Sequence, residues 1–207
     1  MATRSPRSTA RKVLLSLAAL GAAAGIAGLG TFATFTSTTS ASQTVASGTV
    51  TIALGATGAS TNRLTVNVSG IVPGDTMQRS FDLINSGSQD LASVTLTSTA
   101  TTSSLLDTDA TNGLQMVIDR CSIPWVEAGV SPAFTYTCAG TVSTVVASRP
   151  VIGSGVAMSN LTVATAGLTN NLRLTLSFPS AAGSSLQGLS STIQYSFSGT
   201  QRAATNK

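Results

Sequence analysis

The chain has 207 residues, only 9% of them charged, and its eleven basic residues exceed its seven acidic residues by four. Four basic residues (Arg4, Arg7, Arg11, Lys12) lie at the N-terminus, so the rest of the chain carries no net charge. No cluster of Lys and Arg with interleaved aromatics remains there, which excludes the usual nucleic-acid-binding surface. The lack of net charge also favours self-association, because it removes the repulsion between like molecules.

The N-terminus has the three parts of an export signal. A basic head ends at Lys12, an uncharged run of 18 residues follows over 13–30, and Thr31-Phe32-Ala33 forms the exit. This order is typical of a secretory signal peptide. We therefore expect a helical signal peptide over residues 1–33, which a signal peptidase removes by cutting between Ala33 and Thr34. The mature protein is then secreted, and it touches the membrane only through this signal.

A retained membrane anchor is the alternative interpretation of this N-terminus, because 18 uncharged residues are just long enough to span a bilayer. Ten of these residues are Ala or Gly, which contribute little transfer free energy compared with Leu or Ile. Composition therefore favours cleavage over retention. Ala41 and Ala46 are alternative cleavage sites, since each also has a small or short residue three positions earlier.

The rest of the chain is rich in Thr, Val and Ser, and its apolar residues alternate with polar ones in short segments. Such alternation predicts half-buried β-strands. The expected strands, in chain order, are 50–54, 64–68, 77–85, 94–97, 114–119, 134–138, 141–146, 151–158, 172–178 and 193–197. Only short helical turns, near Leu105 and over 184–189, fit the pattern elsewhere. We expect an all-β domain over residues 49–199, folded as an antiparallel two-sheet sandwich of roughly eight to ten strands.

The segments between the strands carry turn signals. Val72-Pro73-Gly74-Asp75 has Pro and Gly at the two central positions of a type II turn. Asn85-Ser86-Gly87-Ser88 predicts a loop between two strands. Residues 34–48, which we call the arm, are rich in Ser and Thr and contain neither charge nor Pro, so nothing in them forbids strand addition. Residues 200–207 predict a polar tail.

Cys121 and Cys138 are the only cysteines, and they close a loop of 18 residues. In an exported protein a disulfide between them is the default, worth about 3 kcal/mol by the chain-entropy estimate. The loop contains the only Trp, Trp125. We interpret it as the structural anchor of an insertion. The alternative is a recognition tip, which would make the protein a monomeric adhesin-like surface module.

The amino-acid composition gives little support for a catalytic site or a metal site. The sequence has no His, so neither an HExxH zinc site nor a Ser-His-Asp triad can be built, and the only Lys beyond the signal is Lys207. Asp107 and Asp109 precede Gly113 by a spacing that is one residue too long for an EF-hand calcium loop. We interpret the two carboxylates as turn residues. We expect no enzyme activity, no cofactor and no metal.

Three segments together resemble the TasA/camelysin family of exported β-sandwich proteins. The first joins Gly30–Thr36 to Val45–Val50, and resembles the family's signal-peptide exit and first strand. The second joins Ile71–Asp75 to an Asn-x-Gly-Ser loop that begins at Asn85. The third joins Leu186-Gln187-Gly188 to a closing strand over residues 193–197.

The resemblance implies a jelly-roll sandwich, processed by a SipW-type signal peptidase and located at the cell surface or in the extracellular matrix. It further implies assembly into fibres in Gram-positive bacteria, where an N-terminal strand of one subunit completes a sheet of the next. In this chain the arm would be that donor strand. The resulting hypothesis is a secreted structural protein of the cell surface or biofilm matrix, whose partners are further copies of itself or related matrix subunits.

Overall fold

The computed structural model describes residues 47–65, 67 and 69–205. The expected signal peptide, its cleavage site at Ala33 and Thr34, and the arm before residue 47 lie outside the described residues. The elements are β1 (Ile52–Leu54), β2 (Thr76–Asn85), β3 (Leu91–Thr102), α2 (Leu105–Thr108), β4 (Gln115–Cys121), β5 (Val126–Val130), β6 (Ala133–Thr137), β7 (Val142–Pro150), β8 (Gly153–Ala157), β9 (Thr169–Ser177), η1 (Ser184–Leu186) and β10 (Thr192–Gln201).

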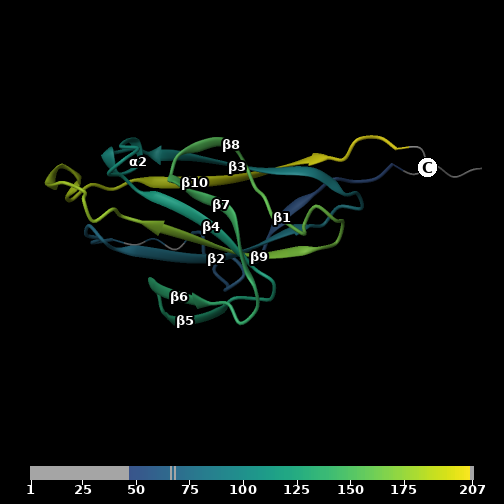
Figure 1. Cartoon of the computed structure of the whole chain (residues 1–207), viewed down its shortest axis with the longest axis horizontal. Coiled ribbons are helices and arrows are strands. Elements are labelled where there is room, and N and C mark those ends of the chain that lie inside the picture. Colours follow the sequence, from purple (N-terminus) through teal and green to yellow (C-terminus); the bar gives the residue numbers. More distant parts are fainter. Residues whose placement is uncertain (1–46, 66, 68, 206–207) are drawn as a thin grey trace, which may run out of the picture. The chain divides into compact units, whose positions relative to one another are not determined.

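These strands form two facing sheets and a separate hairpin (Figure 1). The larger sheet has the order β1-β2-β9-β4-β7, the smaller has the order β10-β3-β8, and β5 pairs with β6. Every pairing between named strands is antiparallel. The predicted all-β antiparallel sandwich is therefore confirmed.

The core lies between the two sheets, where alternate side chains of each strand point inward. Phe81 and Leu83 of β2 and Leu96 of β3 are fully buried. The rings of Phe81 and Phe197 pack across the sandwich with 5.3 Å between their centroids. A second apolar cluster fills the end of the sandwich beside α2 and η1. Its buried members are Leu106, Leu114, Val151, Phe178 and Leu186.

The turn at Val72–Asp75 forms as predicted. Gly74 has a φ of +100°, and the Asp75 N–H donates to the Val72 carbonyl at 3.0 Å. The Asp75 carboxylate also accepts from the Val72 N–H at 2.8 Å. The Gly74 N–H donates to the Phe178 carbonyl at 2.8 Å, which ties the start of β2 to the end of β9.

The prediction of a strand over residues 64–68 is wrong, because the described residues of this range, 64, 65 and 67, do not lie in a strand. Asn62 forms a bridge with Phe81, and the Arg63 N–H donates to the Ser80 carbonyl at 2.8 Å, but pairing with β2 stops there. Leu64 then lies in a turn. Alternation alone predicted a strand at this position, yet a strand also needs a neighbouring edge, and the chain leaves the edge of β2 after Arg63.

The sequence analysis missed β5, which pairs with β6 as a hairpin. Its side chains are mostly exposed, and its Gly129 has a φ of +84°, so it lacks the buried alternation that identified the other strands. The helical turns near Leu105 and Ser184 are confirmed as α2 and η1.

The loop after β2 holds the segment that leads into β1. Asn85 is fully buried, and its side-chain amide closes the loop by accepting from the Gly87 N–H and donating to the Gln89 carbonyl, both at 3.1 Å. Loop N–H groups donate to the carbonyls of Thr49 and Thr51 at 2.9 and 3.0 Å. The entering chain lies so close that a Cβ at Gly87 would be 2.4 Å from the Thr49 oxygen.

We expect Gly87→Ala to lower the free energy of unfolding by about 1–3 kcal/mol, because the added methyl would collide with backbone that must shift. Thermal unfolding followed by circular dichroism measures this change. Ser86→Ala is the matched control, since Ser86 is exposed in the same loop. Equal melting temperatures for the two variants would contradict the close approach.

Candidate functional site

The smaller sheet ends in a long edge that has no partner in the described part of the chain. β10 pairs with β3 on one side, and no described strand pairs with it on the other. Its ten residues, TIQYSFSGTQ, include neither a charge nor a Pro. Natural proteins usually block such edges with charges, Pro, bulges or short strands, because unpaired backbone groups recruit other strands. The sequence of β10 has none of the charged or Pro residues that serve this purpose.

The other edges that the structure describes are better protected. β1 has three residues, and β8 has five, with Gly155 in the left-handed region at a φ of +61°. β7 carries Arg149 and Pro150 at its end. The outer side of β7 is also occupied, because the Asn160 side chain donates to the Thr144 carbonyl at 2.8 Å. β10 is therefore the longest exposed edge in residues 47–205.

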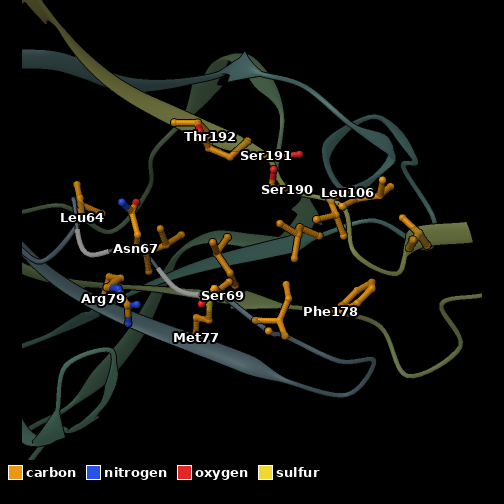
Figure 2. Close-up of a pocket in the computed structure, with 18 of the residues that line it drawn as sticks. Leu64, Asn67, Ser69, Met77, Arg79, Leu106, Phe178, Ser190, Ser191 and Thr192 are labelled. Carbon is orange, nitrogen blue, oxygen red and sulfur yellow. The ribbon is translucent and has the colours of Figure 1, made fainter. Parts of the chain in front are cut away.

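A groove of about 420 Å³ lies beside the first half of β10, between the two sheets (Figure 2). Met77 and Leu176 line it from the larger sheet, and Ile193 and Tyr195 line it from β10. Figure 2 shows Ser190, Ser191 and Thr192 on the side opposite Met77 and Arg79. Its remaining lining residues include Leu64, Asn67, Ser69, Ile71, Leu106, Phe178, Leu186 and Leu189.

The groove exists because β1 is short. It fills the space between the edges of β2 and β10 only near the end of β10, and it leaves the space near the start of β10 open. A Cβ on Gly199 would lie 2.4 Å from the Ile52 Cδ1, so Ile52 packs directly on the backbone of β10 near its end. β1 and the short segment 61–63 pair with β2 from Asn85 back to Ser80. No described segment pairs with this edge of β2 over residues 76–79, and the groove opens there.

Two polar side chains of the groove walls, those of Arg79 and Tyr195, are desolvated by burial. Burial lowers the pKa of Arg79, which lines the groove and is only 5% exposed. The Arg79 guanidinium donates to the Gln78 carbonyl at 2.6 Å, and its carbon lies 5.9 Å from the centre of the Phe134 ring. Burial also raises the pKa of Tyr195 far above its ordinary value. An apolar groove beside unpaired backbone can bind a β-strand by main-chain hydrogen bonds and side-chain burial.

Asp107 fixes the end of the groove at which β10 begins. Its carboxylate closes a capping box on α2 by accepting from the Ser104 N–H at 2.7 Å. The same oxygen accepts from the Ser191 hydroxyl at 2.5 Å, and the other accepts from Ser103 at 2.8 Å. Burial alone would raise the pKa of Asp107, but these hydrogen bonds outweigh it and lower the pKa. The carboxylate thus connects α2 to the residue that precedes β10.

Asp109 is also engaged in a turn. It accepts from the N–H groups of Thr111 and Asn112 at 3.0 and 2.9 Å, and these hydrogen bonds lower its pKa. Both Asp107 and Asp109 therefore act as turn and cap residues in the structure. Within the described residues, no group of three or more His, Cys, Asp or Glu side chains is placed to hold a metal ion.

The Cys121–Cys138 disulfide is present, with the two Cα atoms 5.7 Å apart. It encloses the β5–β6 hairpin, which lies against β2 on the larger sheet (Figure 1). Glu127 in the hairpin accepts two hydrogen bonds from Arg63, at 2.6 and 2.9 Å, and a third from the Tyr136 hydroxyl at 2.8 Å.

The connection into the hairpin is held by a second set of contacts. The Arg173 guanidinium lies 4.4 Å from the centre of the Trp125 ring and bonds to Asp119 at 2.9 Å. The Trp125 indole N–H donates to the Asn171 carbonyl at 3.0 Å. The polar and aromatic side chains of the loop are thus directed at the domain, while Val130 is 77% exposed. This geometry suits the anchoring role; the role itself stays a prediction.

We expect Asp107→Asn to lower the free energy of unfolding at pH 7 by about 1–2 kcal/mol, because it weakens the cap and the bond to Ser191. The pKa of Asp107 lies below its ordinary value of 3.8, so its contribution is present above pH 3.8 and is lost as the pH falls through the lower folded value. Urea unfolding at pH 7 and pH 3 should therefore show a smaller difference between variant and parent at pH 3. Ser191→Ala should reproduce part of the loss at pH 7, and a difference independent of pH would contradict this assignment.

No helix in the described part of the chain combines the length and the apolar character needed to cross a membrane.

Comparison with known proteins places the chain in a family. The family model described as camelysin metallo-endopeptidase matches residues 8–119, which is more than half of the chain. The matched region includes β1, β2, β3 and the Asn85–Ser88 loop, and it ends before the disulfide and β10. No curated protein matches the chain. The chain belongs to the camelysin family, as the resemblance predicted, and the first two of its three segments lie in the matched region.

Proposed function

We propose that the protein is a secreted structural protein of the cell surface or biofilm matrix, which assembles into fibres by strand exchange between subunits. The observation that carries this proposal is the unpaired, uncharged edge of β10 beside an apolar groove. A strand that adds to this edge would form main-chain hydrogen bonds, each worth about 0.5–1.5 kcal/mol net. It would also remove apolar groove surface from water, at about 25 cal/mol per Å².

The arm supplies a suitable donor strand. Residues 34–46 contain no charge and no Pro, and most of them are Thr or Ser. Every residue of this segment therefore has a backbone N–H that can donate to a neighbouring strand. No side chain of the segment would bring a charge into the apolar groove. Export is supported by the N-terminal signal pattern, and it would remove the basic head and leave a neutral mature chain. Self-association of such a chain meets little electrostatic resistance.

The family's description names an endopeptidase, so catalysis is the second candidate. The 207 residues include no His, which is the usual zinc ligand and general base of such enzymes. We therefore propose a structural role rather than a proteolytic one. Cleavage of casein by the pure protein, abolished by a chelator and restored by zinc, would contradict this choice.

We expect protein that starts at Thr34 to form filaments at micromolar concentration, and protein that lacks residues 34–46 to remain monomeric. Negative-stain electron microscopy and light scattering measure the difference. The shorter protein retains the whole described domain, so its melting temperature controls for folding. Filaments from the shorter protein would contradict the donor role. Monomers from both proteins would instead favour the adhesin-like alternative, for which exposed Val126 and Val130 on the hairpin are the available surface.

We expect the double substitution Gln194→Lys and Ser196→Lys to prevent or strongly slow filament growth, because charges on an edge strand disfavour the addition of another strand. Both residues are exposed on the outer face of β10. The control is Thr99→Lys with Thr101→Lys, on exposed positions of β3, which is the inner strand of the smaller sheet. The two variants add the same charge. Equal filament growth would show that the β10 edge is not the acceptor.

A further inference from the structure

We infer that the groove between the two sheets binds a single-chain fatty carboxylate, with its carboxylate at Arg79 and its alkyl chain directed toward Phe178. This inference goes beyond the proposed function, because it assigns a small-molecule ligand that the assembly of subunits does not require. It follows from the position of one buried cation in the groove and from the apolar side chains that continue from it.

The larger sheet gives the groove an apolar floor. Arg79 pairs with Leu174 across β2 and β9, and Met77 pairs with Leu176. Leu174, Leu176 and Phe178 all line the groove. Because alternate residues of an extended chain share a face, these three side chains form a continuous apolar row that begins beside Arg79.

The opposite wall comes from β10 and from the segment that leads into it. Ile193 and Tyr195 line the groove from β10, and Leu189 lines it from the preceding segment. Figure 2 shows Arg79 toward one end of the groove and Phe178 toward the other. A ligand that lies along the groove therefore meets a cation near one end and apolar side chains over the rest of its length.

Arg79 is the only charged residue among the described residues that line the groove. Its side chain is buried, and this burial lowers its pKa. A negative charge beside it would offset the cost of desolvation, because a nearby opposite charge favours the charged form of a titratable group. A carboxylate also matches the planar guanidinium with two parallel hydrogen bonds. Charge complementarity therefore selects an anionic head group over a neutral or cationic one.

The size of the groove limits the rest of the ligand. Its volume of about 420 Å³ lies within the range of small-molecule sites, about 300–1,000 Å³. The Phe178 N–H donates to the Asp75 carbonyl at 2.9 Å, so Phe178 lies beside a residue that precedes Arg79 by four positions. Four residues of extended strand span roughly 13 Å. With C–C bonds of about 1.5 Å, an extended alkyl chain advances about 1.3 Å per carbon, so about ten carbons cover this distance.

Microscale thermophoresis tests the inference with protein that starts at Thr34, labelled at Lys207 and kept at nanomolar concentration so that it stays monomeric. Decanoate is compared with decanol and decyltrimethylammonium, which carry the same chain on a neutral and a cationic head group. We expect decanoate to bind about tenfold more tightly than either, or better. Octanoate and hexanoate should bind about fourfold more weakly for each CH₂ removed. Equal binding of decanoate and decanol, or no binding of decanoate, would overturn the inference.

Two matched pairs of variants locate the site. Arg79→Gln should reduce the preference for decanoate over decanol to less than about threefold. Arg63→Gln should keep the preference, because Arg63 lies 4.5 Å from the centre of the Phe134 ring but does not line the groove. Leu189→Ala should weaken decanoate binding about three- to tenfold, since it removes apolar surface from the groove wall. Leu168→Ala should leave binding unchanged, because Leu168 is similarly exposed but lies outside the groove.

The melting temperature of each variant controls for folding. Loss of the preference in both arginine variants, or equal binding by the two leucine variants, would place the ligand elsewhere and overturn the inference. These measurements use monomers, so their outcome does not depend on whether the protein forms filaments.

Discussion

The structure depends on how the chain is held as it enters the sandwich. The buried Asn85 amide shapes a loop whose N–H groups bind the carbonyls on either side of Val50, and Gly87 lets the two backbones approach. These hydrogen bonds and the close backbone contact fix β1 at one end of the sandwich, where the Ile52 side chain packs on Gly199. Because β1 is only three residues long, the other end of the same side is left open. The groove beside β10 is the direct consequence.

The two ends of the sandwich therefore differ in structure. One end binds the chain that leads out to the arm, through the Asn85 loop and Gln89. The other carries the groove, and its apolar cluster and the Asp107 hydrogen bonds hold α2 and the start of β10 in place. The disulfide closes the loop that holds the β5–β6 hairpin, and this hairpin covers part of the larger sheet and reaches Arg79 through Phe134. In the proposed fibre, the arm would bind at the groove of the next subunit, so each contact leaves one arm and one groove available for further subunits.

Local sequence patterns predicted most of the fold, because apolar and polar side chains must alternate along a strand that has one buried face. The turn at Pro73-Gly74 was equally local, and the disulfide was predicted because the chain has only two cysteines and an export signal. The two errors, the strand expected over residues 64–68 and the missed strand β5, arose because strand formation also depends on whether a partner strand is available. Leu64 and its neighbours alternate like a strand, but no edge is available to them after Arg63. β5 forms because β6 lies beside it, although its own pattern is weak.

The candidate site shows the same limit. The sequence predicted the uncharged arm as a donor strand, but it could not predict the proposed acceptor, because an unpaired edge is a property of the sheet order. The composition of β10 did contain a signal, since a ten-residue strand without charge or Pro is unusual for an exposed edge. That signal becomes interpretable only after the topology places β10 outermost.

The proposed mechanism also requires that strand exchange wait until after export, because an acceptor edge of this kind would otherwise promote association inside the cell. The order of the chain offers a physical reason for such a delay. The arm lies directly between the apolar signal and β1, so before cleavage its N-terminal end continues into the signal. In the proposed strand exchange, an attached apolar segment and its four cations would have to follow the arm to the edge of β10. In the proposed mechanism, removal of the signal would therefore free the N-terminal end of the donor strand as well as release the protein.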